Sequence, residues 1–96
     1  DYNQLLGYFT SRLHVIYSKY DRTMIAWEEL LLEHGKDFKL PNATIVQSWR
    51  SKLALAQIVF AGHRGLLSAG WYLDRQVPGN STHYAWVDTW QDFYQN

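Results

Sequence analysis

The chain of 96 residues contains no cysteine and only two prolines. Without cysteine it has neither a disulfide framework nor a thiolate metal cluster, and thiols do not indicate its redox compartment. It also lacks an excess of one charge, because nine Lys and Arg residues balance nine Asp and Glu residues and are scattered along the chain. No basic stripe is available for a phosphate backbone, so a nucleic-acid partner is not expected. No run approaches the ~20 apolar residues of a membrane span, and the N-terminus lacks the basic and apolar regions of a signal peptide.

Apolar and aromatic residues are abundant instead. Hydrophobic residues make up 47% of the chain and charged residues 19%, which predicts a globular protein with a packed core. Aromatic residues make up 17%, with five Trp and seven Tyr, which exceeds what a small core needs. We therefore expect aromatic faces to take part in recognition as well as in packing.

Helical spacing is visible from the first residues, which predicts that the chain begins inside a domain. The first helix is expected to end near Lys19 and to bury a stripe formed by Tyr2, Leu5, Leu6, Phe9, Leu13, Ile16 and Tyr17. A short helix should start at Glu28 and close at Gly35. A third should be capped by Ser51, stop at Gly62 and present one apolar face, formed by Leu55, Ile58 and Val59. A final aromatic segment has helical spacing at Trp86, Trp90, Phe93 and Tyr94.

Three apolar runs between these helices predict strands over residues 23–27, 43–49 and 65–72. Alternating helices and strands are typical of parallel strands joined by right-handed crossovers. An eight-unit β/α barrel uses ~31 residues per unit, so residues 1–96 hold about three units. The predicted fold class is therefore α/β, a partial (β/α)8 TIM barrel of about three parallel βα units. The alternative, a complete small doubly wound sheet, lacks a glycine-rich phosphate turn after its first strand.

The three predicted strands run into tryptophan, at Trp27, Trp49 and the pair Trp71-Tyr72. In parallel α/β folds the carboxyl ends of the strands meet at one rim, where ligands bind. Indole faces stack on the C–H faces of sugars, and a phenol beside them donates one directed hydrogen bond. We interpret the three tryptophans as one wall of a sugar-binding pocket. For any single tryptophan, plugging the top of the barrel is the alternative.

Two N-glycosylation sequons begin at Asn42 and Asn80, each near a proline in a loop-like stretch. Their presence predicts a glycoprotein of the secretory pathway, lysosomal or secreted. A chance match to this short pattern is the alternative.

Four motifs occur in an order typical of one enzyme family. They are Met24-Ile25-Ala26-Trp27-Glu28-Glu29, Gln47-Ser48-Trp49-Arg50, Trp71-Tyr72-Leu73-Asp74 after Leu67-Ser68-Ala69, and Trp90-Gln91-Asp92-Phe93-Tyr94. With these motifs the chain resembles the family 20 β-N-acetylhexosaminidases. The resemblance covers nearly the whole chain and implies strands five to seven of that family's catalytic barrel, with the start of the long loop after strand seven. Residues 1–96 would then be a partial catalytic domain that lacks the first strands and the last strand.

The resemblance implies hydrolysis of terminal β-linked N-acetylglucosamine or N-acetylgalactosamine with retention, in which the substrate's own acetamido oxygen is the nucleophile. Tyr72 would hydrogen-bond the acetamido carbonyl as the catalytic residue of this chain. Trp27 and Trp49, with Trp71 beside them, would enclose the sugar, and Asp74 would accept hydrogen bonds from its hydroxyls. The implied partners are an N-acetylhexosamine-terminated glycan, the remainder of the barrel and a second copy in a homodimer. No cofactor is implied.

Several family features are absent from the sequence. The family's Asp-Glu pair supplies the general acid/base, and no Asp-Glu dipeptide occurs here. The arginine of the first strand and the Trp-x-Glu of the last strand are also missing. Glu28 and Glu29 are interpreted as surface groups that stabilise a helix start, and not as a substitute pair. The four histidines have no paired spacing, so no metal site is expected.

Three hypotheses remain open from the sequence. The chain is part of an active N-acetylhexosaminidase, a truncated inactive relative that only binds sugar, or a barrel remnant that folds by self-association. An isolated third of a barrel exposes two sheet edges, which disfavours a stable free form.

Overall fold

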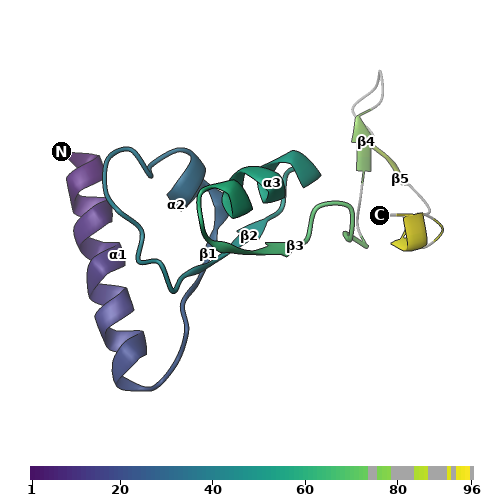
Figure 1. The fold of residues 1–96 in the computed structure, drawn as a ribbon. Helices are drawn as coiled ribbons and strands as arrows, with labels where there is room; N and C mark the ends of the chain where they lie inside the picture. Colours follow the sequence, from purple (N-terminus) through teal and green to yellow (C-terminus); the bar gives the residue numbers. More distant parts are fainter. Residues whose placement is uncertain (74–75, 79–83, 87–90, 92, 96) are drawn as a thin grey trace.

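A computed structural model describes residues 1–73, 76–78, 84–86, 91 and 93–95. Three helices alternate with three strands along the chain (Figure 1). In order these are α1 (Tyr2–Lys19), β1 (Ile25–Trp27), α2 (Glu28–Leu32), β2 (Ile45–Ser48), α3 (Lys52–Phe60) and β3 (Arg64–Leu67). A short hairpin of β4 (Gln76–Pro78) and β5 (Tyr84–Trp86) and a 3-10 turn, Phe93–Gln95, follow beyond β3.

The first three strands form one parallel sheet in the order β1-β2-β3. Ala26, Val46 and Gly65 share one row of the register, and Trp27, Gln47 and Leu66 share the next. Strands that are neighbours along the chain pair in parallel, which confirms the α/β class. Within the described residues the sheet is a partial α/β unit and not a closed barrel.

The two faces of this sheet have different environments. Val46 packs with Met24, Leu40 and Ile58 in the buried core, against which Leu13, Leu31 and Phe38 also pack. Because side chains alternate along a strand, Ala26 in register with Val46 points to the same covered face. The opposite face exposes Ile25, Trp27 and Leu66. One face of the sheet therefore carries a core, and the other carries uncovered apolar side chains.

Helix α1 has the predicted bounds but does not bury the predicted stripe. Gly7 and Thr10 are its buried residues, whereas Tyr2, Leu5 and Phe9 are more than half exposed. A Cβ on Gly7 would lie 3.0 Å from Cβ of Phe38, so the glycine allows Phe38 to pack directly on the helix backbone. The Thr10 hydroxyl donates to the Leu6 carbonyl at 2.8 Å, which satisfies it inside this contact. Helix α1 therefore packs through the face where its backbone comes closest to Phe38, and not through its most apolar stripe.

The ends of the other two helices follow the predictions in part. Ser51 caps α3, because its hydroxyl accepts from the Ala54 N–H at 3.1 Å, and Gly62 follows the helix with φ +89°. Ile58 is buried as predicted, but Val59 is exposed. Helix α2 ends at Leu32 and not at Gly35.

Two predictions for the C-terminal part are wrong. The third strand ends at Leu67 and does not continue to Tyr72, because Ser68 begins a turn that places Gly70 at φ +85°. Trp86 lies in β5, paired antiparallel with β4, and not in a helix with Phe93 and Tyr94. Trp90 lies outside the described residues.

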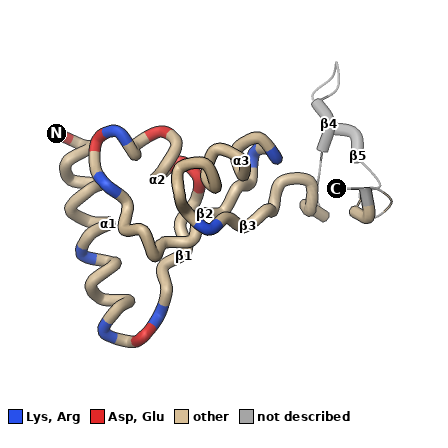
Figure 2. The backbone as a smooth tube through the Cα atoms, viewed as in Figure 1, with Lys and Arg blue, Asp and Glu red and all other residues tan. Residues whose placement is uncertain are grey.

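Charged residues are spread over several elements, with both signs intermixed along the backbone (Figure 2). In the described part of the chain, no helix has the length and apolar character needed to cross a membrane.

Candidate functional site

An aromatic hollow lies at the carboxyl end of the sheet. Trp27 is the last residue of β1, Trp49 directly follows β2, and Tyr72 lies in the loop after β3. Together with Glu29 these three side chains line a hollow of about 400 Å³. The exposed fractions of Trp27, Trp49 and Tyr72 are 56%, 38% and 37%, so their ring surfaces are open to a ligand.

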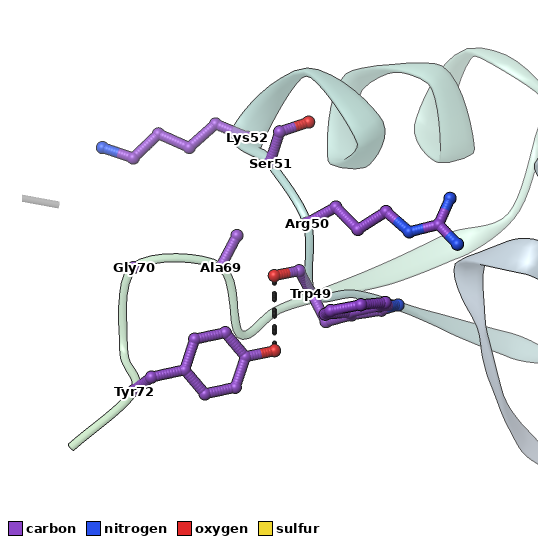
Figure 3. A pocket seen from close by; sticks show the side chains of 7 residues that line it. All are labelled: Trp49, Arg50, Ser51, Lys52, Ala69, Gly70 and Tyr72. Carbon is purple, nitrogen blue, oxygen red and sulfur yellow. Dashed lines mark hydrogen bonds between the residues drawn. The ribbon is translucent and has the colours of Figure 1, made fainter. Parts of the chain in front are cut away.

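A second hollow, of about 300 Å³, shares Trp49 and Tyr72 with the first. Its other lining residues come from the start of α3 and the turn after β3: Arg50, Ser51, Lys52, Ala69 and Gly70 (Figure 3). Trp49 and Tyr72 are therefore the two rings common to both hollows.

The loop that carries Tyr72 is attached to the end of β2. The Ser48 carbonyl accepts from the backbone N–H groups of Ser68 and Ala69, at 2.8 and 3.1 Å, and from the Ser68 hydroxyl at 2.9 Å. The Tyr72 hydroxyl donates to the Trp49 carbonyl at 3.3 Å (Figure 3). This bond is long for an O–H donor, whose usual distance to oxygen is about 2.7–2.8 Å.

Glu28 supports Trp49 from inside the protein. The residue is only 1% exposed, and its Oε2 accepts the backbone N–H of Trp49 at 3.0 Å. Its Oε1 lies 3.5 Å from Nε of Arg50. A buried carboxylate with an ion-pair partner and a backbone donor satisfies the requirements for burying a charge.

Glu29 supports the edge of the Trp49 ring. Its Oε1 accepts from the indole Nε1 at 2.7 Å and from Nη2 of Arg50 at 2.8 Å. Nη1 of Arg50 donates to Glu33 at 2.6 Å, and the guanidinium carbon lies 5.2 Å from the centre of the Trp49 ring. The hydrogen bond to Glu33, with the charges of Glu29, Glu33 and Glu28, raises the pKa of Arg50 above its ordinary value, although desolvation opposes this. Arg50 therefore stays charged.

Glu28 and Glu29 open α2 as predicted, but the prediction that both are surface groups is wrong, because Glu28 is buried and Glu29 is half-buried. Both contact Trp49 and Arg50, which are about 20 residues away in sequence, and such a contact depends on the pairing of β1 with β2. The sequence does contain a signal for this contact: the Glu pair directly follows one predicted strand, and the Trp-Arg pair directly follows the next. Within the described residues, no group of three or more His, Asp or Glu side chains could hold a metal ion.

Comparison with known proteins identifies the family. The family model described as glycosyl hydrolase family 20, catalytic domain, matches residues 1–96. The chain belongs to glycosyl hydrolase family 20. The resemblance predicted from the four motifs is thereby confirmed.

Curated relatives agree with this family. β-Hexosaminidase subunits A1 and A2 from Dictyostelium discoideum are each 44% identical to the chain, over 87 and 88 residues. Each alignment covers 91% of this chain and 16% of the relative. β-Hexosaminidase subunit alpha from Mus musculus is 33% identical over 101 residues, which cover 99% of this chain and 17% of the relative. The chain thus spans about a sixth of the length of these relatives. No solved structure gives a significant match.

The structure groups only some of the predicted site residues of this family 20 chain. Trp27, Trp49 and Tyr72 line one hollow, as the sequence predicted for neighbouring strand ends. Trp71 contacts Phe93 instead, with ring centres 5.5 Å apart. Asn42 is exposed in the segment between α2 and β2. The predictions for Asp74 and Asn80 fall outside the described residues, and the roles of all these residues remain predictions.

Proposed function

We propose that this chain supplies one wall of the sugar pocket of a β-N-acetylhexosaminidase. The complete enzyme would release terminal β-linked N-acetylglucosamine or N-acetylgalactosamine from a glycan. Membership of family 20 and the names of the relatives support the reaction class. The observation that carries the assignment to this chain is the hollow where Trp27, Trp49 and Tyr72 converge at the carboxyl ends of parallel strands.

We propose further that β1, β2 and β3 are strands five to seven of a (β/α)8 barrel, and that residues 1–96 are an incomplete part of this domain. Parallel pairing in chain order supports this. The exposed side chains of Trp27 and Leu66, in one row with the half-buried Gln47, support it as well, since a closed barrel covers its inner face with layers of side chains. The remaining strands, including the general acid/base, would come from outside these residues.

The proposed reaction is a substrate-assisted retaining hydrolysis. The acetamido carbonyl oxygen of the substrate attacks the anomeric carbon, the glycosidic bond breaks, and the leaving oxygen takes a proton from the acid supplied by the rest of the barrel. Water then opens the oxazolinium-type intermediate and restores the original anomeric configuration.

Tyr72 would act on the acetamido group. Its hydroxyl would donate to the acetamido oxygen, which orients the nucleophile toward the anomeric carbon. The phenol has one proton to donate, so the 3.3 Å bond to the Trp49 carbonyl must give way when substrate binds. Because that bond is long, the exchange costs little.

The aromatic side chains would exclude water and stack on the sugar. Trp27 and Trp49 would enclose the N-acetyl group and the sugar face, with Trp71 as an additional wall residue and Asp74 as an acceptor for sugar hydroxyls. The two sequons, at Asn42 and Asn80, support a lysosomal or secreted location for the enzyme. A homodimer is the assembly that we propose.

The test uses the complete protein that contains these residues. We expect it to release nitrophenol from nitrophenyl β-N-acetylglucosaminide, and NMR to show the β-anomer as the first sugar product. An oxazoline-like thiazoline inhibitor should compete with substrate. If no hydrolysis occurs but tryptophan fluorescence changes on titration with N-acetylglucosamine, the protein is a sugar-binding relative without catalysis. If neither occurs, the proposed function is wrong.

A further inference from the structure

We propose that Glu29 is a positioning residue that fixes the plane of the Trp49 indole, through the hydrogen bond of its Oε1 to the indole Nε1–H. This inference rests on the proposed function, because the consequence concerns the bound sugar. Glu29 would not touch the reacting atoms.

Trp49 needs such a support because of where it lies. It follows the last residue of β2 and is 38% exposed, so packing alone holds it incompletely. Its backbone is held on both sides, by Glu28 at the N–H and by Tyr72 at the carbonyl. Neither bond restrains rotation about the side-chain torsions, which have several staggered minima.

Glu29 restrains that rotation at the far edge of the ring. The distance from Oε1 to Nε1 is 2.7 Å, the short length expected when an ionised carboxylate accepts. Arg50 donates to the same oxygen at 2.8 Å and holds the carboxylate in place. Glu29 lies in the first turn of α2, so the helix backbone anchors the acceptor.

Arg50 covers one face of the Trp49 indole. Its guanidinium lies over the ring at 5.2 Å, and in Figure 3 Arg50 and Tyr72 lie on opposite sides of the indole plane. The face toward Trp27 and Tyr72 is the one left to the ligand hollow. Glu29 and Arg50 together therefore determine both which face the sugar meets and the angle of that face.

The angle matters for the rate, because the acetamido nucleophile must lie in line with the anomeric carbon. Binding groups must be held within about 0.5 Å and 10–20° for efficient catalysis. A tilted indole would still bury the sugar, but it would admit orientations in which the nucleophile is misplaced. Loss of Glu29 should lower kcat more than it weakens binding.

Three variants of the complete protein test this. Glu29→Ala removes the acceptor, and we expect kcat to fall about tenfold or more while KM changes less than about threefold. Glu29→Gln keeps an amide oxygen for the indole and should recover to within about threefold of the wild-type kcat. Glu33→Ala is the matched control, because Glu33 binds Arg50 but not Trp49, and its kcat should stay within about twofold.

Equal losses in Glu29→Ala and Glu33→Ala, or no loss in Glu29→Ala, would overturn the positioning role while leaving an active wild type and the proposed function intact. An inactive wild type would remove both. Should Glu29→Ala fail to fold, Glu29→Leu replaces it, because leucine fills a similar volume without an acceptor, and it is combined with Trp49→Phe in a double-mutant cycle, since phenylalanine has no N–H. The proposal expects Glu29→Leu to lower kcat in the wild-type background and to have little further effect in the Trp49→Phe protein; equal losses in the two backgrounds would overturn it.

Discussion

Glu28 combines burial with a charge. One of its oxygens accepts from the Trp49 N–H, and the other lies beside Arg50. The residue is 1% exposed, so protein atoms and not water surround it. This carboxylate stabilises the folded state because it provides the acceptor for the Trp49 N–H, and a buried donor without an acceptor costs about 1–3 kcal/mol. Its role at the site is therefore structural, in contrast to Glu29 at the ring edge.

We expect Glu28→Ala to lower the free energy of unfolding by about 1–3 kcal/mol, since the Trp49 N–H loses its acceptor. Glu28→Gln keeps an acceptor and should lose less. The measurement is urea denaturation of the complete protein. Glu33→Ala removes an exposed partner of Arg50 and should cost under about 1 kcal/mol; a Glu28→Ala protein as stable as this control would contradict the assignment.

Tyr72 differs from both glutamates because it is proposed to contact the reacting group. For Tyr72→Phe in the complete enzyme we expect kcat to fall about a hundredfold, because the acetamido nucleophile loses the contact that orients it toward the anomeric carbon, with a much smaller effect on ground-state binding. Steady-state kinetics with a competitive inhibitor constant separates the two. Rates equal to wild type would remove Tyr72 from this role.

Thr44 belongs to the Asn42 sequon but is 1% exposed, and its hydroxyl has no hydrogen-bond partner among the described residues. A glycan at Asn42 must therefore be attached before this segment folds. Expressed in a eukaryotic secretory pathway, Asn42→Gln and Thr44→Val should each lose the mass of one N-glycan.

Thr44→Val should lose this mass with no fall in melting temperature, because an unpartnered buried hydroxyl gives no stabilisation. Mass spectrometry and thermal unfolding check the two parts. An unchanged mass in Asn42→Gln would show that the sequon is unused.

At the scale of elements, the turn after α2 depends on a close backbone approach. The Gly35 N–H donates to the Leu31 carbonyl at 3.0 Å, and a Cβ on Gly35 would collide with that carbonyl oxygen. Glycine is required here for space and not for an unusual φ, and this turn directs the chain toward Phe38 and Leu40 in the core.

Gly35→Ala should therefore lower the free energy of unfolding by about 1–3 kcal/mol, the usual cost of overpacking. Lys36→Ala, at the exposed neighbouring position, should change it by less than about 0.5 kcal/mol. Chemical denaturation of both proteins measures the difference, and equal stabilities would show that the turn relaxes around the new methyl group.

Helix α1 shows how an element can be placed by its smallest residues. Gly7 and Thr10 form its buried contact, while Leu5, Phe9 and Ile16 remain exposed. The helix therefore presents an apolar surface on the side away from its contact with Phe38. Within the described residues nothing covers this surface.

At the scale of the whole molecule, uncovered apolar surface is the main feature. Ile25, Trp27 and Leu66 are exposed on the sheet, Leu5, Phe9 and Ile16 are exposed on α1, and Phe60 at the end of α3 is 96% exposed. Large exposed apolar patches are typical of interaction surfaces. The two edge strands, β1 and β3, also carry unpaired backbone groups within the described sheet.

Residues 1–96 produced alone are thus expected to self-associate. Sedimentation velocity should show species larger than an 11.3 kDa monomer, and a dye that binds apolar surface should fluoresce with the fragment but not with the complete protein. A well-behaved monomer with cooperative unfolding would contradict this and would favour an independent small domain.

The sequence by itself determined the family, the alternation of helices with parallel strands, the bounds of α1 and the caps of α3. These depend on local pattern: helical spacing, β-branched runs, Ser51 before a helix and Gly62 after one. The convergence of Trp27, Trp49 and Tyr72 also followed from position, because parallel strands end at one rim.

Only the tertiary structure decided which face of α1 is buried, where β3 turns, that Trp71 contacts Phe93, and that Glu28 and Glu29 hold Trp49 and Arg50. Each of these depends on contacts between residues far apart in sequence. A glutamate pair at a helix start has the same local pattern whether water or a neighbouring strand faces it. The burial of these glutamates and the identity of their partners depend on the packed sheet, which brings the end of β2 against the start of α2.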